Sequence, residues 1–283
     1  MGEFSAGKST LANLLIGAPV LPVQVTATQL PPVWIRAGSK DPLLVDMDGN
    51  SRSIDLANIA DLDIEATRYI RVSREADLLG YCDIIDLPGI SDPNMSPEVW
   101  QRVLHHADAI VWCSHATQAW RQSEAAVWDT IPQQLQSRSL LLLTRFDKLT
   151  NELDRERVLR RVRKEAAGKF RGIYPVSLLD AIRADDDREK WIASGAEDFV
   201  GAFVTLLHEL GAMLGTNFDA PVEPNAEQSE VSLRIAKAVS GTGESAPARH
   251  ESAVMPRRVA PSSTGSRPRP GATARPQAPS KGT

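Results

Sequence analysis

Short runs of apolar residues recur along the first three quarters of the chain, and longer stretches with apolar residues at helical spacing lie between and after the later runs. The short runs predict strands at 33–37, 43–45, 69–72, 79–86, 109–114, 140–144 and 172–176. The helical spacing predicts helices at 97–106, 123–135, 151–167 and 196–214. Because strands and helices alternate, we expect an α/β fold with a mostly parallel sheet and helices on both of its faces.

Too few residues separate the first predicted strands along the sequence to form a helical crossover between them. Asp48-Gly49 lies between two of them, and Asp-Gly is typical of a tight hairpin turn. We therefore expect an antiparallel extension at one edge of the sheet.

Composition changes near residue 216. The segment 216–283 consists mainly of Pro, Ala, Ser, Gly and Arg with few large apolar residues, so it cannot bury enough surface to offset the entropy of ordering. We expect one folded domain at 1–215 and a disordered tail at 216–283. From Ala253 onward the tail holds six Lys or Arg and no Asp or Glu. Such a run is usually solvated, and a weak contact with RNA or an anionic membrane is the alternative.

The whole chain has 283 residues, a net charge of −4 and a pI near 5.8, which argues against general nucleic-acid binding. Its two cysteines, Cys82 and Cys113, lie in apolar runs and are expected to be buried, reduced thiols. No apolar stretch is long enough to span a membrane, and no signal-peptide pattern opens the sequence. We expect a cytoplasmic protein, at most peripheral to the inner face of a membrane.

The most specific motif is the nine-residue sequence Gly-Glu-Phe-Ser-Ala-Gly-Lys-Ser-Thr at 2–10. It matches G-x-x-x-x-G-K-[ST], in which backbone N–H groups surround a polyphosphate, the lysine reaches its β and γ oxygens, and the hydroxyl binds Mg²⁺. Apolar residues at helical spacing follow it. The predicted nucleotide-binding residues of this loop are Gly2, Ala6, Gly7, Lys8, Ser9 and Thr10.

A phosphate loop normally lies between a strand and a helix, whose N-terminal N–H groups favour an anion. Here only Met1 precedes Gly2. We expect that the preceding strand is missing because the sequence is a fragment or begins at a start codon assigned too late.

Asp86-Leu-Pro-Gly89 follows the apolar run 79–86. A carboxylate at the end of a strand points into the crevice where open α/β sheets bind ligands. In P-loop proteins such a D-x-P-G sequence supplies an acid near the metal and a glycine that faces the γ-phosphate. Its alternative is a simple turn.

Thr144-Arg-Phe-Asp147 follows the apolar run 140–144 and occupies the place of the guanine motif [NT]-K-x-D. Asp147 would accept two hydrogen bonds from guanine, and Arg145, in place of the usual lysine, could lie over the purine. A helix-capping aspartate is the alternative. Ser177 ends the next strand and is either part of the guanine pocket or a helix cap.

A switch segment is expected between Pro19 and Pro32. A threonine there would bind Mg²⁺ close to the γ-phosphate in the GTP state and release it after hydrolysis. We favour Thr28, and Thr26 is the alternative.

Together these motifs resemble the GTPase domain of bacterial dynamin-like proteins over roughly residues 2–214. The resemblance implies a P-loop NTPase fold of three layers and the hydrolysis of GTP with Mg²⁺, stimulated when two GTPase domains meet across the nucleotide. It implies that Ser9, Thr28 and Asp86 hold the metal. It also implies that Lys8 holds phosphate, Gly89 senses the γ-phosphate, Asp147 selects guanine, and Ser5 helps to place positive charge in the transition state.

Three features depart from this family. Phe4 replaces a polar residue that orients the attacking water in eukaryotic dynamins, Gln29 replaces a threonine, and no long helical stalk follows Leu214. A stalk-bearing partner is therefore expected. Two other functions stay open: a GTP-gated binding module with little or no hydrolysis, and a ribosome-assembly GTPase whose basic tail contacts RNA.

Overall fold

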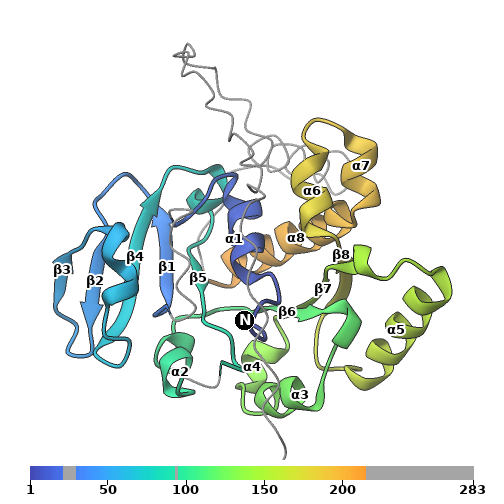
Figure 1. Cartoon of the computed structure of the whole chain (residues 1–283), viewed down its shortest axis with the longest axis horizontal. Helices are drawn as coiled ribbons and strands as arrows, with labels where there is room; N and C mark the ends of the chain where they lie inside the picture. Colours follow the sequence, from blue (N-terminus) through green and yellow to red (C-terminus); the bar gives the residue numbers. More distant parts are fainter. Residues whose placement is uncertain (22–29, 93–94, 215–283) are drawn as a thin grey trace, which may run out of the picture. The chain divides into compact units, whose positions relative to one another are not determined.

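A computed structural model describes residues 1–21, 30–92 and 95–214 (Figure 1). The chain divides into two units, Met1–Gly243 and Glu244–Thr283. The second unit, and with it the predicted tail at 216–283 and its basic run, lies outside the described residues.

The helices and strands of the described part follow one another in an order close to the one that the sequence predicts. In chain order they are α1 (Lys8–Ile16), β1 (Val33–Ala37), β2 (Leu43–Asp46), β3 (Ser51–Ser53), η1 (Leu56–Asp61), β4 (Thr67–Arg74), η2 (Asp77–Gly80), β5 (Ile84–Asp86), α2 (Glu98–Leu104), β6 (Val111–His115), η3 (Ala116–Gln118), α3 (Gln122–Trp128), α4 (Gln133–Gln136), β7 (Leu140–Thr144), η4 (Phe146–Lys148), α5 (Glu152–Glu165), β8 (Gly172–Val176), α6 (Leu178–Ala184), α7 (Arg188–Ala193) and α8 (Ala196–Leu214).

The strands form two sheets. One has the order β3-β2-β4-β1-β5, and the other has the order β6-β7-β8 (Figure 1). The three-stranded sheet is parallel throughout, and β1 is also parallel to β4. The β2–β3, β2–β4 and β1–β5 pairs are antiparallel. The α/β class is confirmed, and so is the hairpin at Asp48-Gly49, but the antiparallel part is larger than expected.

Strand β7 explains why helices cover both faces of its sheet. Its side chains alternate: Leu140 and Leu142 pack with apolar residues of α1 and α8, whereas Leu141 and Leu143 pack with Trp112, Trp128 and residues of α2 and α5. All four leucines are buried. A strand buried on both faces needs apolar residues at every position, which is the composition that predicted it.

The two sheets meet at the beginning of the chain. The ammonium group of Met1 donates to Val111 O (2.9 Å), and Cys113 N donates to Met1 O (2.7 Å). Gly2 thereby forms a parallel bridge with Cys113. Within the described residues, this two-residue segment is what lies between the edge strands β5 and β6, so the expected single sheet is interrupted there.

Two predicted elements were partly wrong. The strand expected at 79–86 begins as the 3-10 turn η2 and becomes β5 only at Ile84, and the helix expected at 123–135 is divided into α3 and α4. Pro132 separates these two helices because proline has no N–H to continue the helical hydrogen bonds. The short helices α6 and α7 were not predicted.

Candidate functional site

The phosphate loop crosses from the Met1–Gly2 bridge to the N-terminus of α1. Gly7 precedes the helix with φ of 85°, and Gly2 has φ of 138°. A Cβ atom at Gly2 would lie 2.0 Å from Cys113 O, so the close approach to β6 requires glycine. The loop residues therefore lie between the Gly2–Cys113 bridge, which pairs with β6, and the N-terminus of α1.

Lys8 and Ser9 are the first two residues of α1, and their side chains contact different segments. Lys8 Nζ donates to Glu3 O across the loop (2.8 Å), and burial lowers the pKa of the Lys8 ammonium while the Asp86 carboxylate raises it. Ser9 Oγ donates to Asp86 Oδ2 (2.6 Å), which joins α1 to the end of β5. A hydroxyl and a carboxylate at this separation are oxygen ligands of the kind that Mg²⁺ prefers, so the two side chains fit the metal that the motif implies. Thr10 lies in the same first turn.

The Asp86–Gly89 segment packs directly on the phosphate loop. A Cβ atom at Gly89 would lie 2.7 Å from both N and Cα of Phe4, so only glycine fits there. Ile90 N donates to Gly2 O (3.2 Å), and Phe4 N donates to Ser91 Oγ (3.1 Å). A movement of Gly89 would therefore displace the phosphate loop, because the two segments are in direct contact.

The guanine-motif residues follow β7 and approach the loop from its other side. Thr144 Oγ1 donates to Ala6 O (2.8 Å), and the Arg145 guanidinium donates to Ser5 O (3.0 Å). Arg145 has φ of 53°, so its backbone is left-handed. The expected placement of Arg145 over a purine stays untested; the observed contact is with the loop backbone.

Asp147 and Ser177 lie together at the ends of neighbouring strands. Ser177 Oγ is 3.1 Å from Asp147 Oδ1, and Lys148 Nζ is 3.3 Å from Asp147 Oδ2. Ser177 also caps α6, because its Oγ accepts from Asp180 N (3.4 Å). Ser177 therefore caps α6 and also contacts Asp147.

A cavity of about 350 Å³ joins several of these residues. Its lining includes Lys8, Ser9, Asp86, Gly89 and Arg145. It also includes Phe4, whose ring is half exposed. The switch residues Thr26 and Thr28 lie outside the described residues, so the register of the switch stays a prediction.

His115 ends β6 and lies next to the short helix η3. Its Nδ1 accepts from Thr117 N (3.4 Å), which caps η3. Burial lowers the pKa of His115, and the charges of Arg145 and Arg121 lower it further. The ring is therefore a neutral capping group near the loop at pH 7.

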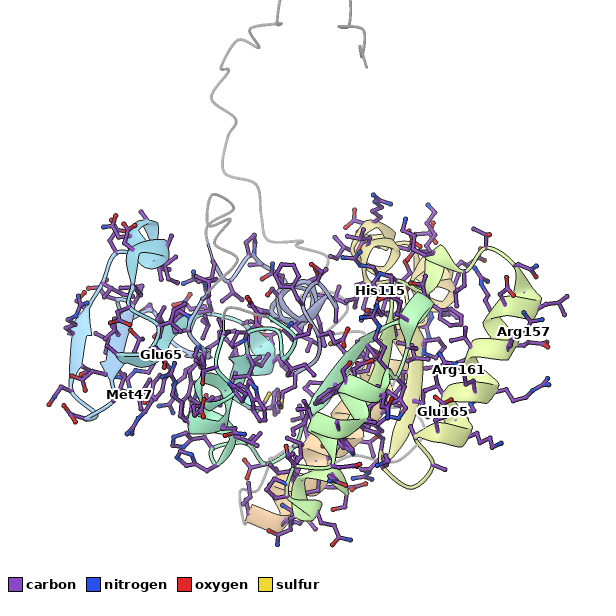
Figure 2. All side chains as sticks on the ribbon, turned by 60° about the horizontal axis from the view of Figure 1, so that its bottom comes forward. Met47, Glu65, His115, Arg157, Arg161 and Glu165 are labelled. Carbon is purple, nitrogen blue, oxygen red and sulfur yellow. The ribbon has the colours of Figure 1, made fainter. Side chains whose placement is uncertain are left out.

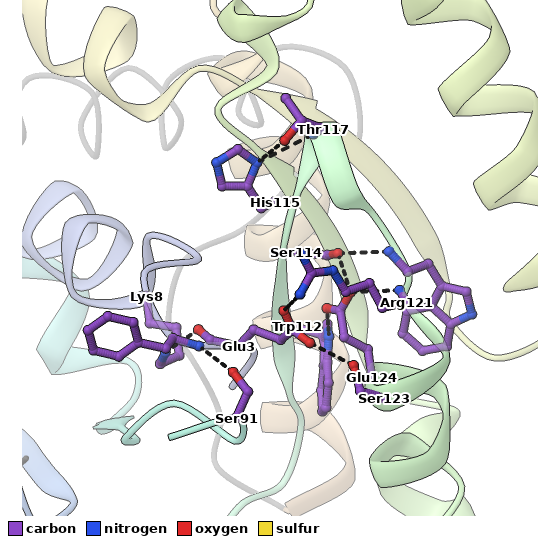
Figure 3. A network of polar contacts seen from close by, with 12 residues as sticks. Glu3, Lys8, Ser91, Trp112, Ser114, His115, Thr117, Arg121, Ser123 and Glu124 are labelled. Atoms are coloured by element: carbon purple, nitrogen blue, oxygen red, sulfur yellow. Dashed lines mark hydrogen bonds and ion pairs between the residues drawn. The ribbon is translucent and has the colours of Figure 1, made fainter. Parts of the chain in front are cut away.

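Sequence reasoning missed a group of residues around the start of α3. Figure 3 shows the Glu3 carboxylate of the loop facing Arg121 and Ser123, and Glu124 beneath them against β6. Glu124 accepts from Trp112 Nε1 (2.9 Å), Ser114 Oγ (2.8 Å) and Arg121 N (3.0 Å). The available signal was a glutamate three residues after Arg121 at the start of a helix, which is a weak capping pattern.

These contacts define a nucleotide-binding α/β domain with a phosphate loop at the start of α1. The family model described as the Dynamin family matches residues 1–146, more than half of the chain. The chain belongs to the dynamin family and carries a GTPase domain of that type.

Two relatives can be compared with it. "Dynamin-like protein 2" of Campylobacter jejuni is 25% identical over 160 residues, which cover 54% of this chain and 26% of the relative. A solved chain from an oligomerised bacterial dynamin pair has a TM-score of 0.51 and 15% identity, with 83% of this chain and 35% of that chain covered. This chain thus spans about a quarter of the curated relative, and the structural likeness supports the fold.

Proposed function

We propose that the chain binds GTP and hydrolyses it to GDP and phosphate with Mg²⁺. One observation supports this most: Ser9 of the motif at 2–10 contacts Asp86, and Thr144 and Arg145, which precede the Asp147–Ser177 pair, contact the backbone of the same loop. A nucleotide-binding site needs groups that bind the phosphates and groups that bind the base. Lys8, Ser9 and Asp86 suit the first, and Asp147 suits the second.

At the phosphate end, Lys8 would leave Glu3 O and place its charge on the β and γ oxygens. Ser9 and Asp86 would hold Mg²⁺, with Thr28 as a further oxygen ligand in the GTP state; bound Mg²⁺ would neutralise charge on the phosphates. The Gly89 main chain would face the γ-phosphate, and Ser5 would help to place positive charge in the transition state. Thr28 lies outside the described residues, and Thr26 is the alternative for its role; the other residues have the positions given above.

At the base end, Asp147 would accept hydrogen bonds from the ring N–H and the exocyclic amine of guanine. Adenine does not offer this pair of donors. Charge-assisted hydrogen bonds of about 1.5–3 kcal/mol in a partly buried site correspond to roughly tenfold to hundredfold discrimination between the bases.

A second candidate function is a GTP-gated binding module with slow hydrolysis. Phe4 favours it, because this half-exposed ring at the cavity cannot orient water or accept a proton. Rapid mixing of the protein with an equal amount of GTP separates the two functions. One turnover within minutes supports the enzyme, and bound GTP that persists for hours supports the module.

The chain would work in pairs, with a second copy or with a stalk-bearing dynamin-like protein. The solved relative comes from an oligomerised bacterial dynamin pair that provides a mechanism for the long-range sensing and tethering of membranes. None of the helices in the described ranges is long and apolar enough to cross a membrane. Light scattering with GDP and with a non-hydrolysable GTP analogue would test the pairing.

Replacement of Lys8 by alanine tests the proposed function. The Lys8→Ala variant removes the point charge from a loop of neutral amides and should lose GTP affinity roughly a hundredfold. Lys164→Ala removes an exposed lysine of α5 and should bind like the wild type. Chelation of Mg²⁺ should stop hydrolysis. Micromolar GTP affinity in the Lys8→Ala variant would contradict the assignment.

A further inference from the structure

The phosphate loop carries a carboxylate that faces away from the Ser9–Asp86 pair. Glu3 Oε1 accepts from Ser123 Oγ (2.7 Å), and Glu3 Oε2 is 3.3 Å from the Arg121 guanidinium (Figure 3). The Glu3 side chain is only 14% exposed, whereas that of Arg121 is 45% exposed. Two side chains at the start of α3 thus hold one acidic residue of the loop.

Glu3 also shapes the loop through its main chain. Its carbonyl oxygen accepts from Ala6 N (3.2 Å) and from Lys8 Nζ (2.8 Å). A shift of the Glu3 backbone would therefore move both the turn of the loop and the resting position of Lys8. The side-chain contacts of Glu3 are connected to phosphate binding through this one residue.

The residues that hold Glu3 are themselves fixed to β6. Arg121 N donates to Glu124 Oε2, and the buried Glu124 carboxylate also accepts from Trp112 and Ser114 of β6. Arg121 is the capping residue just before α3, and these hydrogen bonds hold its backbone in place. Its guanidinium extends toward the loop. This arrangement suits a residue that orients another.

A carboxylate in a loop that binds an anion is unfavourable unless its charge is balanced, because like charges repel over several ångströms. We propose that Arg121 is a positioning residue that balances the charge of Glu3 and keeps its carboxylate turned toward α3. The phosphate loop can then accept a nucleoside diphosphate or triphosphate. The inference rests on the proposed function, and it adds a specific electrostatic role that none of the loop motifs contains.

The test is a double-mutant cycle with fluorescently labelled GDP as the probe and the full chain as the protein. Arg121→Ala leaves Glu3 uncompensated and should weaken GDP binding on the order of threefold to tenfold. Glu3→Gln removes the charge of the carboxylate and sets the reference GDP affinity for the double variant. The double variant Glu3→Gln with Arg121→Ala should recover most of the lost affinity, since no carboxylate then remains to be neutralised.

A matched control and the salt dependence exclude a general charge effect. Arg157→Ala removes an exposed arginine from the outer side of α5 (Figure 2) and should leave GDP affinity unchanged. The Arg121→Ala defect should shrink at high salt because screening weakens the repulsion. If Arg121→Ala does not fold, Arg121→Gln keeps a polar side chain without the positive charge and is measured in its place.

Two results would overturn the inference: unchanged GDP affinity after loss of Arg121, or a double variant that binds as weakly as Arg121→Ala or more weakly. The second result would mean that Arg121 acts on the fold or on the nucleotide directly. A wild-type chain that does not bind GDP would instead contradict the proposed function, and the inference with it.

Discussion

At the scale of single residues, a buried polar network at the start of α3 supports the phosphate loop. Glu124 is central to it: its side chain is 1% exposed and receives three hydrogen bonds from Trp112, Ser114 and Arg121. Burial raises the pKa of its carboxyl group, although the three hydrogen bonds oppose this shift. Each of the three donors would lose its acceptor if this side chain were removed.

Glu124→Gln should lower the free energy of unfolding by about 1–3 kcal/mol. The amide NH₂ of glutamine would replace a carboxylate oxygen that accepts hydrogen bonds, and it would face one of the donors. The pH dependence should change as well. In the wild type the folded state holds the Glu124 proton more tightly than the unfolded chain, so stability falls as pH rises from the ordinary pKa of 4.5 through the raised pKa of the folded state.

Urea unfolding of both proteins over this pH range measures the two effects. The Gln variant should lack the Glu124 contribution to the slope. Equal stability and an equal slope in the two proteins would show that the Glu124 network is not the stabilising unit described here.

At the scale of elements, the sequence predicts what periodicity and turn chemistry determine. Strands β7 and β8 and helix α8 have the predicted bounds, because each is a continuous apolar or amphipathic run with clear ends. The division at Pro132 and the turn η2 depend on local backbone chemistry inside an apolar run, which periodicity alone does not resolve.

The candidate site shows the same limit. Motif spacing finds the residues that would touch the nucleotide, and the structure brings Ser9 and Asp86 together, and also Asp147 and Ser177. Residues that support the loop from another element, such as Arg121, carry no motif. Their role follows only from the fold, which brings together residues far apart in sequence.

Helix α2 illustrates a contact between elements that no pattern predicts. The Arg102 guanidinium donates to Ile64 O (2.7 Å) and Glu65 O (3.3 Å), in the segment just before β4. Met47 and Glu65 lie at this end of the five-stranded sheet (Figure 2). Burial lowers the pKa of Arg102. Since α2 follows the Asp86–Gly89 segment in the chain, this contact connects the helix after that segment to the residues just before β4.

Arg102→Met should lower the free energy of unfolding by about 0.5–1.5 kcal/mol, because it keeps the apolar stem and removes the donor to the carbonyls of Ile64 and Glu65. Hydrogen exchange should accelerate first in α2. Arg163→Met, on the exposed face of α5, is the matched control. An Arg102 variant with the stability and exchange of this control would show that the contact contributes nothing.

At the scale of the whole folded unit, the interruption between the two sheets is the main feature. A cavity of about 450 Å³ lies between β5 and β6 and is lined by residues that include Leu15, Ile84, Val111 and Leu206. Burial lowers the pKa of the Met1 ammonium group at its edge. The cavity has open strand edges and apolar walls, which are the surroundings of an inner strand.

Addition of about six apolar, β-branched residues before Met1 should fill this cavity, raise the melting temperature and tighten GTP binding, because a held loop loses less entropy on binding. A six-residue Gly-Ser extension is the control. Thermal unfolding with and without GTP and Mg²⁺ compares the three proteins. The same GTP-dependent shift in all three would mean that the loop is already held by the Met1–Gly2 bridge.

The central claim is that this site recognises a guanine nucleotide, and Asp147→Asn tests it most directly. Asparagine presents a donor where xanthine has an acceptor, so the variant should lose GTP affinity and gain affinity for xanthosine triphosphate. Asp154→Asn, on exposed α5, should keep the preference for GTP. Competition between GTP and xanthosine triphosphate measures the change. An Asp147→Asn protein that prefers GTP by the wild-type margin would contradict the account.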